Sequence, residues 1–437
     1  MKGDKVMAVL EEPILLDITG RDIVNELAGI KSMLSKNIPI VYGFYINGSE
    51  SDPSACVTYV KDAIGATPAK MNYTTDTFEY GSWQGAFFMP RPCILAQDGT
   101  VMKYLNPNDY TKDIDGNTVT IDSGLTGANV MIEWPKIWMR IIPTYGNSYS
   151  GTVLFSNQQV DPYFNDFPYI NYQGIHKDHF YTAAYNGSVS SSVMRSISDA
   201  QVSNKLTAQV EVNAATANGN GWYTETLSQI QLINMLLVLI GKSTNTQAVF
   251  GQGLNTSGTE AINNDFRTGV HNTRGLFYGT NSGAAATYTN AVKVFGMENW
   301  WGFQWRRYAG HIVVNGQQKI KLSYDTSDGS TVTGYNGGNT WSTAGTGYIE
   351  AGDVPSGTSG GYINKMTFDD ISILPSTASG SSTTYYCDGL WFNNSATTYA
   401  VRGGGSGHGA LVGAFYVSVY VGPGNTSWYI GAALSYV

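Results

Sequence analysis

The sequence is poor in charged residues. Lys, Arg, Asp and Glu make up 13% of its 437 residues, which is about half the share of a typical soluble domain. The formal net charge is −8, and the densest basic cluster is the pair Arg306 and Arg307. Affinity for nucleic acid rests largely on phosphates neutralised by Lys and Arg, so we expect no nucleic-acid partner.

Cysteines and long apolar runs are also scarce. The three cysteines, Cys56, Cys93 and Cys387, are odd in number and widely spaced, which excludes a disulfide framework and offers no metal-binding pair. The longest apolar run, residues 232–240, is about half the length of a membrane span. The first residues lack the apolar core of a signal peptide. We therefore expect synthesis in a cytoplasm, without a signal peptide, and no membrane insertion.

Motifs of catalysis are missing as well. The Gly-rich segments 251–258 and 279–283 lack the Lys-Ser/Thr that ends a phosphate loop, and no G-x-S-x-G elbow indicates a hydrolase. His176 and His179 have the i, i+3 spacing of metal ligands. Because no Cys lies nearby, a loop or strand-edge pair is the favoured interpretation over a metal site. The sequence thus predicts no enzyme, no cofactor and no metal.

Glycine and tyrosine are abundant instead, with 51 Gly and 29 Tyr. Tyr, Ser, Gly and Asn also dominate the binding loops of antibodies, where they give aromatic area and adaptable hydrogen bonds. Many all-β extracellular and virion proteins have this composition too. It favours binding without establishing it.

Two helices are expected. The segment 16–35 has a plausible capping box at Thr19 and Asp22, and its apolar residues follow a 4-3-4 spacing. It is either a helix packed on its own domain or an oligomer seam or docking peg. The segment 226–240 has a capping box at Thr226 and Gln229, is apolar nearly all round and precedes Gly241 as a stop. We expect this helix to be buried.

Most other segments have the pattern of strands. Residues 38–143 are β-like, with a hairpin signal at Asp98-Gly99 and an apolar strand pair at 130–143. The Tyr-, Asn- and Pro-rich residues 144–174 have the pattern of a long loop. From 250 to 437 we expect short strands between Gly/Ser/Thr/Asn loops.

Tryptophans cluster in the segment "VFGMENWWGFQWRR", residues 294–307. Trp300, Trp301 and Trp305 lie within six positions. A tryptophan-rich core seam is the favoured interpretation. Buried indole N–H groups need acceptors, and Glu298 and Asn299 are the candidates in the sequence.

Two motifs carry a resemblance to a known family. "GMENWWGFQW" resembles the core of the C-type lectin-like fold found in formylglycine-generating enzymes and their non-enzymatic relatives. The ending "RGGG…GAFYVSVY…SWYIGAALSY" is similar to the end of that fold, and closer to the C-terminal variable domains of phage receptor-binding proteins diversified by retroelements. The enzymes use a cysteine pair, but the C-terminal half here has Cys387 alone. The Glu-Pro-Asn and Gln-Pro-Asp triplets of calcium-dependent lectins are absent too.

The resemblance implies an α+β chain in three parts. Residues 1–37 would be an N-terminal helix and attachment segment, 38–143 a β-rich virion-attachment module, and 144–437 a C-type lectin-like receptor-binding domain that reaches the C-terminus.

The last 36 residues, 402–437, contain no Lys, Glu, Asp, Gln or Met. In the diversified relatives a constant framework alternates with positions randomised at adenines, which cannot become Lys, Glu, Gln, Met or Trp. The framework here would comprise Gly403, Gly404, Gly409, Gly413, Phe415, Trp428, Gly431 and Leu434, with Ile430 as a further core anchor. The predicted ligand-binding residues between them are Gly405, Ser406, Gly407, His408, Leu411, Ser418, Tyr420, Val421 and Tyr429.

The function implied is that of a phage adhesin at a tail fibre or tail tip. It would recognise a host bacterial surface receptor, protein or glycan, non-covalently through a variable C-terminal face. We expect a homotrimer that joins other tail proteins through its N-terminal region, located in the virion tail and made in the host cytoplasm. The alternatives are a non-binding virion structural protein and a glycan-degrading enzyme, and acidic residues converging in a deep pocket would favour the enzyme.

Overall fold

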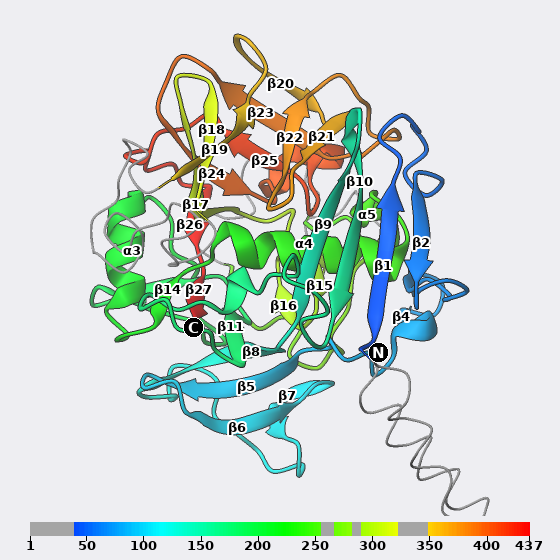
Figure 1. Ribbon diagram of the computed structural model, residues 1–437. Coiled ribbons are helices and arrows are strands. Elements are labelled where there is room, and N and C mark those ends of the chain that lie inside the picture. The colour runs from blue at the N-terminus through cyan, green and yellow to red at the C-terminus, as the bar shows by residue number, and fades with distance from the viewer. Residues whose placement is uncertain (1–38, 255–265, 282–289, 322–347) are drawn as a thin grey trace, which may run out of the picture. The chain divides into compact units, whose positions relative to one another are not determined.

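The computed structural model describes residues 39–254, 266–281, 290–321 and 348–437 (Figure 1). The chain divides into two compact units, Met1–Ile40 and Val41–Val437. The helix expected at 16–35 and the attachment segment 1–37 lie outside the described residues. The second unit is rich in strands and holds few helices among its described residues, which agrees with a mixed α and β class.

The longest described helix lies in the core. α4 (Leu227–Gly241) begins at a capping box in which Thr226 and Gln229 hydrogen bond reciprocally, and every one of its residues is buried. It ends at Lys242, whose φ of 49° is left-handed, one residue after the expected stop. The prediction of a buried helix is confirmed. The other helical elements described are α3 (Ala208–Thr216), α5 (Thr246–Phe250) and the 3-10 turns η1 (Gly81–Trp83), η2 (Phe167–Tyr169) and η6 (Ser406–Leu411). Among the described helices, none is long and apolar enough to cross a membrane.

A four-stranded antiparallel sheet holds the start of this unit. Its order is β2 (Val57–Lys61), β1 (Val41–Ile46), β10 (Asn147–Ser156) and β9 (Trp138–Thr144). β10 lies where a long loop was expected. The polar sequence of β10 does not have the pattern of a strand. It forms one because it pairs with β1 on one side and β9 on the other, and such tertiary context can override local preference.

A seven-stranded sheet joins distant parts of the chain. Its order is β14 (Trp222–Thr224), β27 (Leu434–Tyr436), β11 (His179–Ala183), β8 (Ala128–Pro135), β5 (Arg91–Ala96), β6 (Val101–Asn106) and β7 (Asp109–Asp113). The hairpin expected at Asp98-Gly99 is confirmed between β5 and β6, where Gly99 has φ 85°. Both strands expected at 130–143 are present as β8 and β9, but they do not pair with each other, because β8 has β5 and β11 on its two edges and β9 joins the other sheet.

The third sheet carries the candidate site. Its eight described strands follow the order β19 (Ile349–Asp353), β18 (Gln317–Ile320), β17 (Trp305–Val314), β24 (Thr398–Arg402), β25 (Val417–Val419), β23 (Gly389–Asn393) and β20 (Thr358–Tyr362), with β26 (Ile430–Ala432) paired to β17. Figure 1 shows α4 between this sheet and the strands β8 and β11.

Four two-stranded ribbons complete the described strands. They are β3 (Lys70–Asn72) with β4 (Thr77–Glu79), β12 (Ser188–Ser190) with β13 (Val193–Arg195), β15 (Lys293–Val294) with β16 (Met297–Glu298), and β21 (Lys365–Phe368) with β22 (Ile373–Thr377). The boundary predicted at residue 143 falls inside β9, and strands from both sides of it share two of the sheets.

Candidate ligand-binding site

The floor of the site is a cross-strand row in the eight-stranded sheet. Trp391 of β23 pairs with Ser418 of β25, which pairs in turn with Val401 of β24. Side chains directly opposite each other project from the same face of a sheet. Val401 pairs in turn with Arg307 of β17, and Trp305, two residues before Arg307 on the same strand, lies opposite Ile430 of β26. The strand register therefore gathers residues that are far apart in the sequence.

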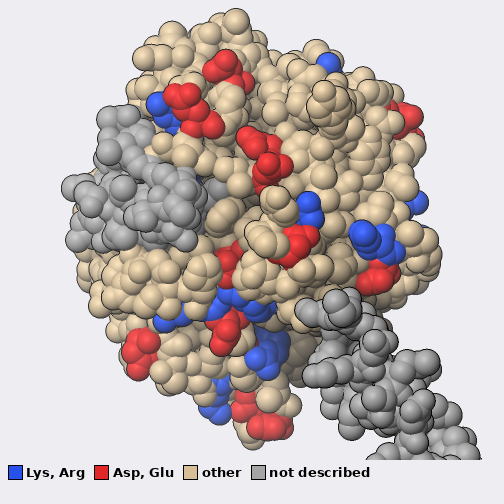
Figure 2. Space-filling model, viewed as in Figure 1, with Lys and Arg blue, Asp and Glu red and all other residues tan. Residues whose placement is uncertain are grey.

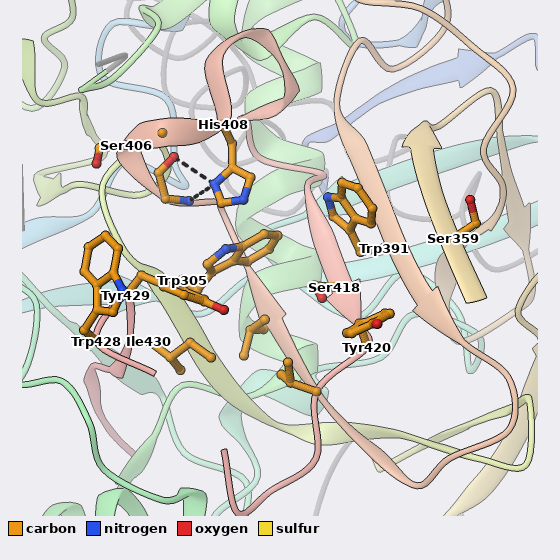
Figure 3. Close-up of a pocket in the computed structure, with 14 residues that line it drawn as sticks. Trp305, Ser359, Trp391, Ser406, His408, Ser418, Tyr420, Trp428, Tyr429 and Ile430 are labelled. Atoms are coloured by element: carbon orange, nitrogen blue, oxygen red, sulfur yellow. Dashed lines mark hydrogen bonds between the residues drawn. The ribbon is translucent and has the colours of Figure 1, made fainter. Parts of the chain in front are cut away.

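A turn and a loop raise the walls around this row. The turn η6 carries His408 over the floor, and the residues after β25 carry Tyr420 and Tyr429. Figure 3 shows Trp391 and Tyr420 on one side and Trp428 and Tyr429 on the other, with the Trp305 ring between them and His408 beside it.

These walls enclose a cavity of about 520 Å³, within the usual range for small-molecule sites. Trp391 and Tyr420 are 37% and 45% exposed. Fourteen residues line the cavity, and none of them is Asp, Glu, Lys or Arg: Trp305, Ser359, Trp391, Val401, Gly405, Ser406, Gly407, His408, Ser418, Tyr420, Val421, Trp428, Tyr429 and Ile430.

The structure brings eight of the nine candidate residues together at this cavity. They are Gly405, Ser406, Gly407, His408, Ser418, Tyr420, Val421 and Tyr429. The ninth, Leu411, does not line the cavity and packs against the main hydrophobic core. Their role in ligand binding stays a prediction, but their convergence follows directly from the fold.

Sequence reasoning missed six lining residues. Trp428 and Ile430 were assigned to the core, whereas both also face the cavity, and Trp305 was assigned to a core seam. Trp391, Ser359 and Val401 lie outside the last 36 residues. The 37% exposure of Trp391 is known only from the structure, so no signal in the sequence distinguished this residue from a buried tryptophan. No local signal marks Ser359 or Val401, because their place depends on strand register.

The Trp391 ring lies against a position that has no side chain. A Cβ built on Gly360 of β20 would lie 2.3 Å from Cε3 and 2.4 Å from Cδ2 of Trp391. The indole N–H donates a hydrogen bond to the hydroxyl of Tyr416. One edge of this wall is therefore fixed by a glycine and a buried phenol.

Tyr416 is itself tightly enclosed. A Cβ at Gly389 would lie 2.3 Å from its Cε2, and a Cβ at Gly404 would lie 2.4 Å from its Cδ1. Its ring centroid is 4.5 Å from that of Trp305 and 5.6 Å from that of His408. Burial raises the pKa of the Tyr416 hydroxyl, so this group is neutral. Tyr416 thus positions three aromatic walls of the cavity without lining it.

Two of the predicted framework glycines, Gly403 and Gly404, form the backbone next to Tyr416. Gly403 and Gly404 have φ values of 81° and 71°, a region that favours glycine. The N–H of Gly302 donates to the carbonyl of Gly403 at 2.9 Å, and the N–H of Gly403 donates to the carbonyl of Tyr416 at 2.8 Å. The two motifs that carry the family resemblance therefore meet behind the cavity.

His408 is a neutral imidazole in this site. Its Nδ1 lies 3.1 Å from the backbone nitrogen and 3.2 Å from the carbonyl oxygen of Gly405, so Nδ1 accepts from the one or donates to the other according to the tautomer. Burial lowers the pKa of His408. The ring packs edge-to-face on Trp305 at 5.3 Å between centroids.

Several polar groups of the cavity have no internal partner. Ser406 and Ser418 are 2% and 6% exposed, and neither hydroxyl makes a hydrogen bond to any other described residue. The hydroxyls of Ser359, Tyr420 and Tyr429, which are more exposed, also make no hydrogen bond to another described residue. The cavity therefore offers both aromatic surface and free hydroxyl groups.

The buried arginines of the sheet near the cavity are paired with buried carboxylates. Arg306 and Arg402 alternate with cavity-facing residues and both bind the buried Glu225, at 3.1 Å and 2.5 Å. Arg402 also stacks on the Trp300 ring at 3.5 Å. Burial lowers the pKa of Arg306 to about 10, so its guanidinium group stays charged at neutral pH. Arg307, the other member of the basic pair in the sequence, binds the buried Glu211 of α3 at 2.8 Å.

The acceptors expected for the clustered tryptophans were wrong. The Trp300 N–H donates to Oδ1 of Asn234 at 2.9 Å, and the Trp301 N–H donates to the carbonyl of Gly251 at 3.0 Å. Both acceptors are distant in sequence, so local spacing could not indicate them. The core seam itself is confirmed, because all three clustered tryptophans are at most 4% exposed.

His176 and His179 do not form a common site. His176 contacts Asp166 at 2.8 Å, and His179 lies 4.0 Å from Glu133. Across the part of the chain that the structure describes, no group of three His, Cys, Asp or Glu residues could hold a metal ion. Cys387 is buried and free of any disulfide with the other two cysteines.

Comparison of the sequence with family models and with curated proteins finds no match.

Proposed function

We propose that this protein is a phage adhesin, located at the tail tip or fibre, that binds a host cell-surface receptor non-covalently in the cavity beneath η6. A C-type lectin-like domain would carry the cavity. The observation that carries the proposal is the convergence of eight of the nine predicted ligand-binding residues on one aromatic cavity.

The walls of the cavity suit recognition better than catalysis. No carboxylate lines it, so the acid and base of a glycan-degrading enzyme have no counterpart there. The aromatic rings are held by Gly360 and Tyr416, and rigid aromatic walls bind with little loss of side-chain entropy. These features favour the adhesin over the enzyme.

The variable positions are compatible with a stable fold. The side chains of Tyr420, Val421 and Tyr429 lie at the cavity and are only partly buried or exposed, whereas Tyr416 and Phe415 beneath them are buried. Substitution at Tyr420 changes the cavity with little effect on the core, whereas Val421 and Tyr429 also pack against the edge of the core. A surface of this kind fits a receptor that varies between hosts.

We expect the partners to be a bacterial surface receptor, other tail proteins and two further copies of the chain. Weak single-site affinity would be multiplied by copies on the particle. Figure 2 shows Lys and Arg interspersed with Asp and Glu on the described part of the face that it presents, with no wholly basic area. This distribution gives nucleic acid no evident site on that face.

Binding of the purified full chain to whole cells of a candidate host tests the proposal. The test variant replaces His408, Tyr420 and Tyr429 with Ala, and the control variant replaces Tyr145 and Tyr163, which are 104% and 71% exposed and lie outside the cavity. We expect at least a tenfold loss for the test variant and no loss for the control. Equal binding by all three proteins, or no binding by the wild type, would leave a structural virion component as the better interpretation.

A further inference from the structure

We propose that the cavity takes an uncharged sugar ring, a pyranose residue of a neutral surface glycan. This inference rests on the proposed function, because it names the chemical class of the receptor that the adhesin binds. Three features of the cavity carry it: the absence of charge in its lining, the facing aromatic rings and the free hydroxyl groups.

The lining excludes a charged ligand group. No Lys, Arg, Asp or Glu is among the residues that line the cavity, and the buried arginines of the sheet are already paired, Arg306 and Arg402 with Glu225 and Arg307 with Glu211. A carboxylate or phosphate entering this space would lose its water without gaining a counter-ion. An acidic sugar is therefore a poor ligand here.

The aromatic rings suit the flat face of a sugar. Trp391 and Tyr420 form one wall, Trp428 and Tyr429 the other, and Trp305 lies between them (Figure 3). The face of an aromatic ring carries negative charge density, whereas the axial C–H bonds of a pyranose carry partial positive charge. A pyranose ring between these walls would place its C–H face on an indole.

The free hydroxyl groups decide between a sugar and an apolar side chain of a protein receptor. Ser406 and Ser418 are nearly fully buried and open to the cavity, and their hydroxyls have no partner among the described residues. An apolar occupant would strip water from these hydroxyls and from those of Tyr420 and Tyr429 and leave them unpaired, which is unfavourable. A polyol instead supplies a donor or acceptor to each, and it can also hydrogen bond to the imidazole of His408 in either tautomer.

An array of bacterial surface glycans, with neutral and acidic chains matched in size, tests the inference with the purified full chain. We expect the wild type to bind neutral chains at least tenfold more tightly than acidic ones. Trp391→Ala should lose this binding at least tenfold, and Trp391→Phe should recover part of it, since Phe restores a flat face. Gly424→Ala is the matched control, because a Cβ at Gly424 meets nothing within 4 Å.

Each outcome separates the inference from the proposed function. Failure of the wild type to bind any neutral chain, equal binding of acidic chains, or full binding by Trp391→Ala would overturn the sugar ligand. If host-cell binding persists in that case, and treatment of the cells with protease abolishes it, the adhesin stands with a protein receptor. Binding to neutral chains without binding to host cells would support the sugar ligand and count against the adhesin.

Discussion

The buried charge cluster behind the cavity gives the sharpest stability prediction. Glu225 is fully buried and accepts hydrogen bonds from Arg306 and Arg402, whose side chains are 1% exposed. Glu225→Gln keeps the volume of the side chain and removes its charge, which leaves two guanidinium groups in the interior without a counter-ion. Breaking a buried pair by neutralising one partner costs about 3–5 kcal/mol.

Urea unfolding at pH 7, followed by tryptophan fluorescence, measures this change in the free energy of unfolding. A loss of about 3–5 kcal/mol corresponds to a change of roughly 10²–10⁴ in the unfolding equilibrium constant. Glu79→Gln is the control, since its pair with Lys70 is exposed on both sides and such pairs contribute about 0–1 kcal/mol.

A second variant separates charge from packing. In the double variant Glu225→Gln with Arg402→Met, one of the two uncompensated charges is gone, so we expect a smaller loss than for Glu225→Gln alone. A loss of less than about 1 kcal/mol for Glu225→Gln would refute the reasoning, since such a cost is that of an exposed pair.

Three further predictions concern the core and the cavity wall. Gly360→Ala should displace the Trp391 ring and destabilise the fold by about 1–3 kcal/mol, seen as a changed near-ultraviolet circular dichroism spectrum, whereas Gly424→Ala should change neither the spectrum nor the stability. Asn234→Leu leaves a buried indole N–H and the carbonyl of a neighbouring segment unpaired, and should lower the free energy of unfolding in urea by about 2–5 kcal/mol; a neutral result would contradict the assigned hydrogen bonds. Burial lowers the pKa of His311 from 6.5 to about 4, so the unfolded chain takes up its proton at a higher pH than the native state. The contribution of neutral His311 to the free energy of unfolding is about 3 kcal/mol. It is fully present above pH 6.5 and is lost as the pH falls toward 4. Wild type should therefore lose about that much more stability than His311→Gln between pH 7 and pH 4, and parallel pH profiles for the two proteins would count against a buried neutral imidazole.

Local signals in the sequence predicted the parts of the fold that depend on near neighbours. The capping box at Thr226 and Gln229 marked the start of α4, and Asp98-Gly99 marked the β5–β6 hairpin. These features are set by hydrogen bonds and φ angles within a few residues. The prediction of the helix end missed by one residue, because Lys242 takes the left-handed conformation that usually falls to glycine.

Pairing between distant segments could not be predicted in the same way. β8 is buried along almost its whole length, so its apolar sequence has no alternation that would indicate a partner. Its two neighbours, β5 and β11, are supplied by other regions of the chain. The hydroxyl-rich β10 was missed for the same reason, since its partners rather than its own residues make it a strand.

The candidate site was predicted where it is built from the last 36 residues and missed where it is built from earlier strands. The pattern of the last 36 residues picked out eight residues of the cavity, because they all lie on one turn, one strand and one loop near the C-terminus. Trp391 and Ser359 come from β23 and β20, which join β25 through strand register alone. No spacing rule in the sequence connects these strands.

The place of β27 has a consequence for biosynthesis. This strand of three residues pairs with β14 on one side and β11 on the other. Its partners lie about 210 residues (β14) and 255 residues (β11) earlier in the sequence, so they are synthesised long before it. During translation the seven-stranded sheet has a gap in its middle until residues 434–436 have left the ribosome. From the synthesis of β14 onward, which is about the second half of translation, the nascent chain therefore carries two unpaired strand edges, and such edges recruit other chains. Loss of the last four residues would leave that gap open in the finished chain and make it prone to aggregation.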